Sequence, residues 1–179
     1  MLRVRSALLA VFLVAGAAPA SAQGRPASPA CAEVESFAEL DFWLGEWDVL
    51  VNDQVVGHNR IEKILEGCAV MEHWTDSGGG EGKSLFYHIP ATGDWKQVWV
   101  TGNATRPGGV KEKTLVERPG EGAVRFQGRI QRPNGSTYLD RTTLTPSPDG
   151  TVRQVIELST DEGETWRSVW DSVYRRKED

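Results

Sequence analysis

From residue 46 to residue 175, apolar and aromatic residues alternate with polar ones in short runs that end in Gly, Pro, Asn or Asp. Successive side chains of a β-strand point to opposite faces, so an alternation of period two predicts half-buried strands. The pairs Asn134-Gly135 and Asp149-Gly150 favour hairpins, because a type I′ turn needs positive φ at both central positions. Together the runs predict about ten strands, at residues 46–52, 54–64, 68–75, 83–89, 95–101, 110–117, 123–130, 136–144, 151–158 and 165–175.

The connections between these runs are too short for the crossovers that join parallel strands, so neighbouring strands must pair antiparallel and in sequence. A flat sheet of this size would leave two open edges and one apolar face in water, and closing the sheet removes both. We therefore predict an all-β fold, an up-and-down antiparallel barrel. A two-sheet sandwich is the alternative.

A helical pattern precedes the strands. Val34, Phe37, Leu40 and Leu44 recur at steps of three and four residues, which predicts a short N-terminal amphipathic helix. Gly45 follows at the position where a helix C-cap is expected.

Residues 1–22 are typical of a secretory signal peptide, with a basic start, a short apolar stretch and an A-x-A cleavage site that ends at Ala22. The apolar stretch is shorter than the ~20 residues of a membrane-spanning helix, so no membrane insertion is expected after cleavage. We predict a periplasmic or secreted protein with a flexible tether at residues 23–32 and one barrel domain at residues 33–179. In such an oxidising compartment Cys31 and Cys68 are expected to form a disulfide.

The charge distribution limits the partners of the protein. The net charge is −5, and no segment concentrates Lys and Arg, which argues against a nucleic-acid-binding protein. Loss of the two arginines of the signal peptide makes the mature chain more acidic, and this disfavours anionic membrane surfaces. No His or Cys spacing typical of zinc sites is present, so no metal is expected.

Some predicted strands carry faces that mix tryptophans with isolated polar groups. Trp95, Gln97 and Trp99 share one face, and Trp166 shares another with Trp170. This mixture suits a cavity that holds an organic molecule. The alternative is that the rings fill the barrel and that Gln97 bonds to another buried amide, Gln154. The side chains predicted to contact a ligand are Glu72, Trp74, Trp95, Gln97, Trp99, Arg141, Gln154 and Trp170.

Glu72 is the strongest candidate for chemistry, because it shares a predicted strand face with Trp74. Burial beside indoles raises the pKa of a carboxyl group, which is the condition for a general acid. Arg141 could pair with this group or bind a carboxylate of the ligand. Alternatively, Glu72 bonds to backbone or indole N–H groups and only seals the barrel floor.

Several motifs resemble a large family of exported bacterial proteins of unknown function, which opens with FDFWxGxWxV and is treated as lipocalin-like. The resemblance covers Phe42 to Arg176, and its one departure is Leu40, where the family has Phe. It implies a calycin-type barrel related to lipocalins, fatty-acid-binding proteins and nitrobindin. The motifs are Phe42-Trp43-Leu44-Gly45-Glu46-Trp47-Asp48-Val49, Gly67-Cys68, Trp95-x-Gln97-x-Trp99 and Gly163-x-x-Trp166.

The resemblance also implies structural roles. Gly45-Glu46-Trp47 is similar to the lipocalin G-x-W motif, whose Trp packs over the barrel base beneath an Arg from the end of the last strand. Arg175 or Arg176 is placed to do this, and we assign the role to Arg175, with a cation–π contact worth about 0.5–2 kcal/mol. Nitrobindin-like barrels bind haem through a His on a late strand, but no His follows His88, so no cofactor is expected.

These features leave three hypotheses for function. In the first, an exported lipocalin-like barrel binds a small, mostly apolar ligand in its lumen. In the second, the protein is an enzyme that acts on such a ligand with Glu72 as general acid or base. In the third, it is a structural or interaction domain whose filled barrel has no cavity above about 300 Å³. We favour the first, a binding protein rather than an enzyme.

Overall fold

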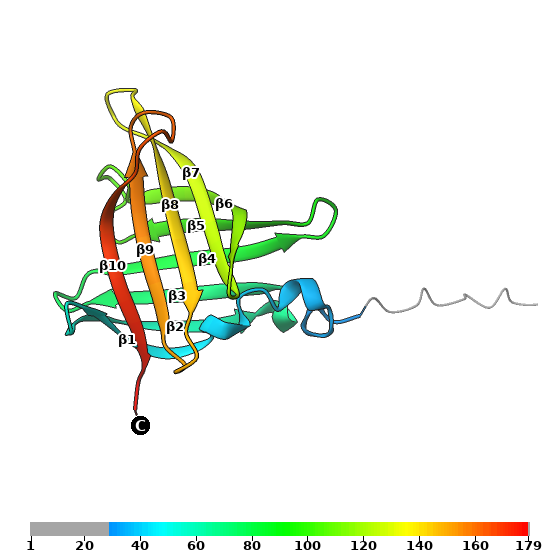
Figure 1. Cartoon of the computed structure of the whole chain (residues 1–179). Coiled ribbons are helices and arrows are strands. Elements are labelled where there is room, and N and C mark those ends of the chain that lie inside the picture. Colours follow the sequence, from blue (N-terminus) through cyan, green and yellow to red (C-terminus); the bar gives the residue numbers. More distant parts are fainter. Residues whose placement is uncertain (1–28, 179) are drawn as a thin grey trace, which may run out of the picture.

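The computed structural model describes residues 29–178, which form one antiparallel sheet that closes into a barrel (Figure 1). Each strand pairs with its neighbours in sequence, and β1 pairs with β10. The predicted all-β up-and-down barrel is confirmed, and the sandwich alternative is wrong. The strands are β1 (Gly45–Val51), β2 (Gln54–Ile64), β3 (Ala69–Asp76), β4 (Glu81–Ile89), β5 (Asp94–Thr101), β6 (Val110–Gly120), β7 (Ala123–Gln131), β8 (Thr137–Pro146), β9 (Val152–Ser159) and β10 (Arg167–Arg176).

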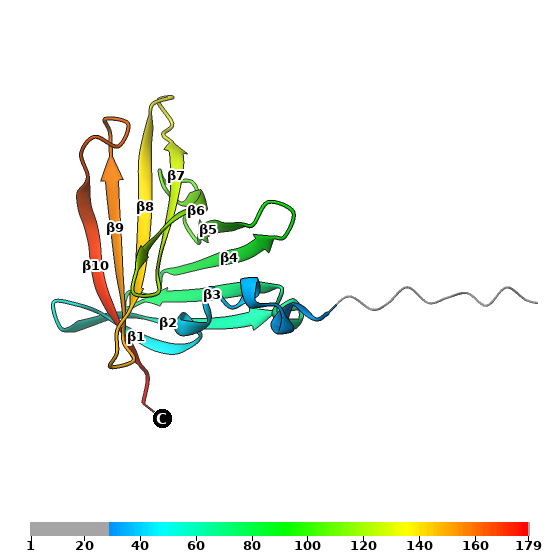
Figure 2. The same ribbon diagram turned by 45° about the vertical axis from the view of Figure 1, so that its right-hand side comes forward.

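The strands of the two halves of the barrel run crosswise to each other, with β2–β5 lying across the direction of β7–β10 (Figure 1 and Figure 2). The predicted signal peptide and residues 23–28 of the predicted tether lie outside the described residues. Within the described part of the chain, no helix is long and apolar enough to cross a membrane.

Hairpins form at both predicted glycine turns, but without the expected type I′ geometry. Only Gly135 and Gly150 have positive φ there, and each donates its N–H to the carbonyl three residues earlier. Each glycine is therefore the left-handed residue of a longer hairpin loop. Two consecutive residues with positive φ join β1 to β2 instead, where Asn52 and Asp53 have φ values of 48° and 61°.

The predicted N-terminal helix is replaced by three short 3₁₀ turns, η1 (Cys31–Glu33), η2 (Glu35–Phe37) and η3 (Asp41–Trp43). Val34 interrupts the helical backbone because its φ and ψ, −105° and 118°, are extended. A 3₁₀ helix has three residues per turn, and the buried side chains Phe37, Leu40 and Trp43 recur at that spacing. A fourth turn, η4 (Leu65–Gly67), joins β2 to β3.

This N-terminal segment closes one end of the barrel. The Trp43 ring is fully buried and packs edge-on against Phe86 and Tyr174, at centroid distances of 5.6 and 5.7 Å. The Trp95 indole donates a hydrogen bond to the Ser36 carbonyl at 3.1 Å. The predicted disulfide between Cys31 and Cys68 is present and ties η1 to the start of β3.

The arginine over Trp47 is Arg176, and the assignment of this role to Arg175 is corrected. The Arg176 guanidinium lies 4.4 Å from the Trp47 ring centroid and donates to the Leu44 carbonyl at 3.1 Å. Arg175 has the opposite strand parity, pairs with Asp48 across the β1–β10 ladder and is exposed. Alternation along β10 therefore decides which arginine reaches the barrel base.

Candidate functional site

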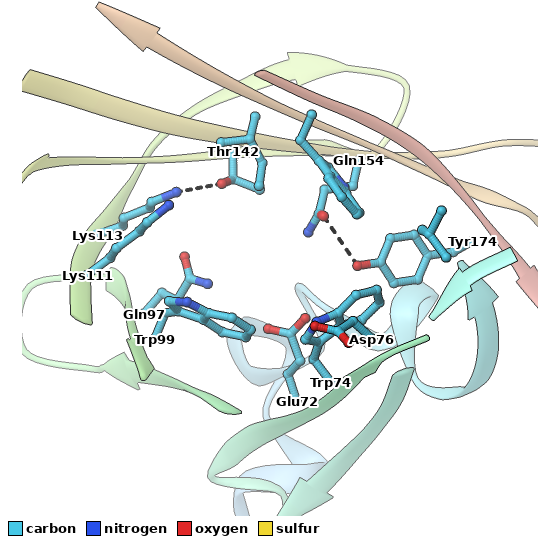
Figure 3. A pocket seen from close by; sticks show the side chains of 13 residues that line it. Glu72, Trp74, Asp76, Gln97, Trp99, Lys111, Lys113, Thr142, Gln154 and Tyr174 are labelled. Carbon is cyan, nitrogen blue, oxygen red and sulfur yellow. Dashed lines mark hydrogen bonds between the residues drawn. The ribbon is translucent and has the colours of Figure 1, made fainter. Parts of the chain in front are cut away.

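A cavity of about 330 Å³ lies inside the barrel, away from the end closed by the 3₁₀ turns (Figure 3). Alternate side chains of β3 show its direction. Val70 is fully buried and pairs with Phe86 at the closed end, Glu72 is 5% exposed, Trp74 is half-buried and Asp76 is exposed. The cavity therefore runs from a floor at Glu72 to a mouth near Asp76.

Three indoles form the apolar wall near the mouth. Trp74 and Trp170 pack edge to face with ring centroids 6.1 Å apart. Trp99 lies on the backbone of β4, because a Cβ added at Gly82 would be 2.2 Å from the Trp99 ring. Glycine at this position therefore provides the room for the indole. Val56 and Ile156 complete this wall.

A hydrogen-bond network forms the floor of the cavity. Asn59 Nδ2 and Ser84 Oγ donate to the two oxygens of Glu72, at 2.7 and 2.5 Å. Gln97 Nε2 donates to Ser84 Oγ at 3.1 Å. On the other side, Asn59 Nδ2 also lies 3.3 Å from the Tyr174 hydroxyl. Side chains from four neighbouring strands, β2 to β5, are therefore joined through one buried carboxyl group.

The network also corrects one sequence-based alternative, because Gln97 and Gln154 do not bond to each other. Gln154 Oε1 accepts from the Tyr174 hydroxyl at 3.3 Å. Gln97 Oε1 is buried and has no hydrogen-bond partner among residues 29–178. This oxygen is therefore available to accept a hydrogen bond from a molecule in the cavity.

Burial raises the pKa of Glu72, and the hydrogen bonds from Ser84 and Asn59 and the charge of Lys113 oppose this effect. The net direction is upward, because removal from water penalises the carboxylate more than these contacts stabilise it. Glu72 bonds to side chains rather than to backbone or indole N–H groups, and it lines the cavity.

Two lysines and one aspartate form a buried charged cluster on the opposite side wall. Lys113 Nζ donates to Asp140 Oδ1 at 2.5 Å and to Thr142 Oγ1 at 2.6 Å, and Lys111 Nζ lies 2.6 Å from Asp140 Oδ2. Burial, opposed by Asp140 and assisted by Lys111, lowers the pKa of Lys113 to about 8. Burial alone would raise the pKa of Asp140, but the two ammonium groups lower it.

The cavity brings together most of the predicted ligand contacts. Six of the eight line it: Glu72, Trp74, Gln97, Trp99, Gln154 and Trp170.

The placement expected for the other two residues is corrected. Trp95 shares an inward strand face with Gln97, but it lies at the closed end, where its ring packs against Phe37 at 6.4 Å. Arg141 points out of the barrel, donates to Glu157 at 2.7 Å and lies 3.9 Å from the Trp166 ring centroid. Alternation along β8 turns this side chain away from the lumen.

Sequence reasoning missed the charged cluster and three side chains of the floor network, Asn59, Ser84 and Tyr174. Asn59 and Tyr174 could have been found from alternation, because Asn59 shares a strand face with the apolar Ile61 and Tyr174 shares one with Trp170. The pairing of Lys113 with Asp140 has no local signal, since 27 residues separate them.

The comparisons with known proteins add no relative, because no protein-family model and no curated protein sequence matches this chain. Within residues 29–178, no three His, Cys, Asp or Glu side chains are grouped so that they could hold a metal ion.

Proposed function

We propose that this barrel binds a small amphipathic molecule in its lumen. The observation that carries the proposal is the cavity of about 330 Å³, which combines an indole wall at its mouth with a buried polar floor. Binding pockets for organic molecules have this composition and begin at about 300 Å³. The size is above the limit expected for a filled barrel, so it favours a ligand over a purely structural domain.

The two parts of the cavity define complementary parts of the ligand. Trp74, Trp99 and Trp170 offer flat apolar surface near the mouth, which suits an aromatic ring or a short hydrocarbon chain. The unpaired Gln97 Oε1 at the floor can accept a hydrogen bond from a polar head group. A buried acceptor without a partner is costly, so a head group with a donor gains affinity there.

Filling the cavity tests this proposal. A panel of 1-decanol, geraniol, 2-naphthamide and the corresponding acids is titrated by calorimetry and by tryptophan fluorescence. Binding by at least one member is expected, and Ile156→Trp should abolish it because Ile156 lines the cavity. Val155→Trp is the matched control, since this neighbour has the opposite strand parity. A panel that leaves the protein unaffected, or equal binding to both variants, contradicts the proposal.

Glu72 supports a second candidate function, catalysis on the same ligand. Its carboxyl group lies at the floor of an open cavity, and burial favours its protonated form by raising its pKa, which is how a general acid is prepared. If the protein is an enzyme, prolonged incubation converts a bound panel member into a product detectable by mass spectrometry, and Glu72→Gln stops this conversion. Recovery of every ligand unchanged excludes this function for the panel.

Export and membership of the lipocalin-like family belong to the same proposal. The disulfide between Cys31 and Cys68 and the Trp47–Arg176 contact support it, together with the signal-like residues 1–22. Intact mass spectrometry of protein recovered from its host tests the export. We expect a chain that begins near Gln23 and carries one disulfide, whereas a full-length reduced chain would contradict it.

A further inference from the structure

The charged cluster of Lys111, Lys113 and Asp140 leaves one positive charge without an opposite charge. Both ammonium groups contact the same carboxylate, through Asp140 Oδ1 and Oδ2. The side chains of Lys113 and Asp140 are 3% and 0% exposed, and that of Lys111 is 19% exposed. Water therefore screens the excess charge poorly, and an anion in the cavity would be attracted to it.

Among residues 29–178, the other acidic groups of the cavity form no ion pair with this cluster. Glu72 accepts hydrogen bonds from Asn59 and Ser84 instead. Its charge is the weakest influence on the pKa of Lys113, after burial, Asp140 and Lys111. Asp76 is exposed at the mouth, where one of its oxygens accepts the backbone N–H groups of two loop glycines. Figure 3 shows Lys111 and Lys113 together on one side of the cavity, across from Tyr174.

Hydrogen-bond donors in the cluster also exceed the acceptors. An ammonium group has three N–H donors. Within residues 29–178, Lys113 uses two of them, on Asp140 and Thr142, and Lys111 contacts Asp140 as an ion pair. Both lysines line the cavity, and the remaining donors can bind the acceptor groups of a ligand.

We propose that Lys111 and Lys113 bind the carboxylate of an organic acid whose apolar body lies against the indoles. The inference rests on the proposed function, because the acid occupies the same cavity. Trp99 pairs with Lys111 in the β5–β6 ladder, so the apolar wall begins directly beside the cationic one. A carboxylate matches the single excess charge and accepts several hydrogen bonds, whereas a phosphate dianion would leave a buried negative charge unpaired.

Isosteric acid and amide probes test the inference. Calorimetric titration at pH 7 with 2-naphthoic acid and 2-naphthamide compares a charged and a neutral head group on the same ring. We expect the acid to bind at least about tenfold more tightly, the usual effect of a charge-assisted hydrogen bond. Lys111→Gln should remove this preference, and Lys111→Met, which keeps the aliphatic stem, should do the same.

Lys96→Gln is the matched control, because it removes the same charge from β5 on the outer face, where Lys96 bonds to Thr114. This variant should keep the full preference for the acid. Equal affinity for acid and amide, or a preference that survives both Lys111 variants, overturns the inference and leaves the ligand-binding proposal intact. Failure of every neutral and acidic panel member to bind overturns both.

Discussion

Replacing Glu72 by Gln tests the protonation state of the cavity floor. The two side chains are nearly isosteric, and Gln can still accept from Asn59 and bond to Ser84. The pKa of Glu72 is raised above 4.5, first by burial, so the folded protein keeps a proton that the unfolded chain has already released. The stability that this proton contributes is complete below pH 4.5 and is lost as the pH rises through the folded-state pKa.

The magnitude follows from proton linkage. Between pH 4.5 and the folded-state pKa of Glu72, the free energy of unfolding of the wild type falls relative to that of Glu72→Gln. The decrease is at most about 1.4 kcal/mol per pH unit. The difference becomes constant above the folded-state pKa, where both states carry the charged carboxylate. Burial lowers the pKa of Lys113 and raises that of Tyr174, and the charge of Glu72 also acts on both groups, so the difference between the two profiles includes their response to the substitution. We expect Glu72→Gln to fold and to gain stability over the wild type toward neutral pH.

The assay is urea denaturation from pH 2.5 to pH 8, followed by tryptophan emission. Glu62→Gln provides a control of opposite sign, because hydrogen bonds from Arg60 and His73 lower the pKa of the exposed Glu62. Its contribution is present above pH 4.5 and is lost in acid. Parallel pH profiles for the wild type and Glu72→Gln would refute the raised pKa, and an unfolded Glu72→Gln would show that the carboxyl group is required for folding.

Two further predictions concern the closed end of the barrel. Arg176→Ala should lower the free energy of unfolding by about 0.5–2 kcal/mol, because it removes the contact with Trp47. Arg175→Ala should change this free energy little. Equal effects of the two substitutions in urea denaturation would contradict the assignment of Arg176 as the arginine over Trp47. Cys31 and Cys68 are 37 residues apart, and replacing both by Ser should lower the free energy of unfolding by roughly 3–4 kcal/mol, because the unfolded chain gains conformational freedom. An unchanged melting temperature in calorimetry would show that the disulfide does not stabilise the fold.

Alternation within single strands was enough to predict the barrel and much of its lumen. Along β3, Glu72 and Trp74 point inward, whereas His73 lies on the outer face with Glu62. Along β5, the same parity places Gln97 and Trp99 inside the barrel. Local sequence carries this information because a slip of one residue would exchange the two faces of a strand.

Depth along the barrel axis and pairing between distant strands could not be predicted in this way. Trp95 has the correct parity for a ligand contact, but Ser36 and Phe37 of the N-terminal segment reach its end of the barrel first. No repeating pattern in β5 shows which end that segment covers. The 3₁₀ turns themselves were missed because the spacing of Phe37 and Leu40 fits an α-helix as well.

Strand β6 shows most clearly how the closed sheet overrules a local pattern. Its apolar residues Val110 and Val116 are 47% and 55% exposed, whereas Lys113 is buried. Pairing with β5 places Lys113 opposite the inward Gln97. Gly128 lets β7 approach the backbone of β6 closely, because an added Cβ would lie 1.9 Å from the Glu112 carbonyl oxygen, and Lys113 reaches past β7 to Asp140 on β8.

This arrangement is costly for a barrel that only has to fold. Well-packed apolar side chains commonly stabilise a protein as much as a buried ion pair or more, because removing charges from water is expensive. The cluster of Lys111, Lys113 and Asp140 also retains an excess charge beside a cavity, which adds to that cost. Sequences depart from the local rules of folding mainly where function requires it, so recognition of an anion explains these three residues better than stability does.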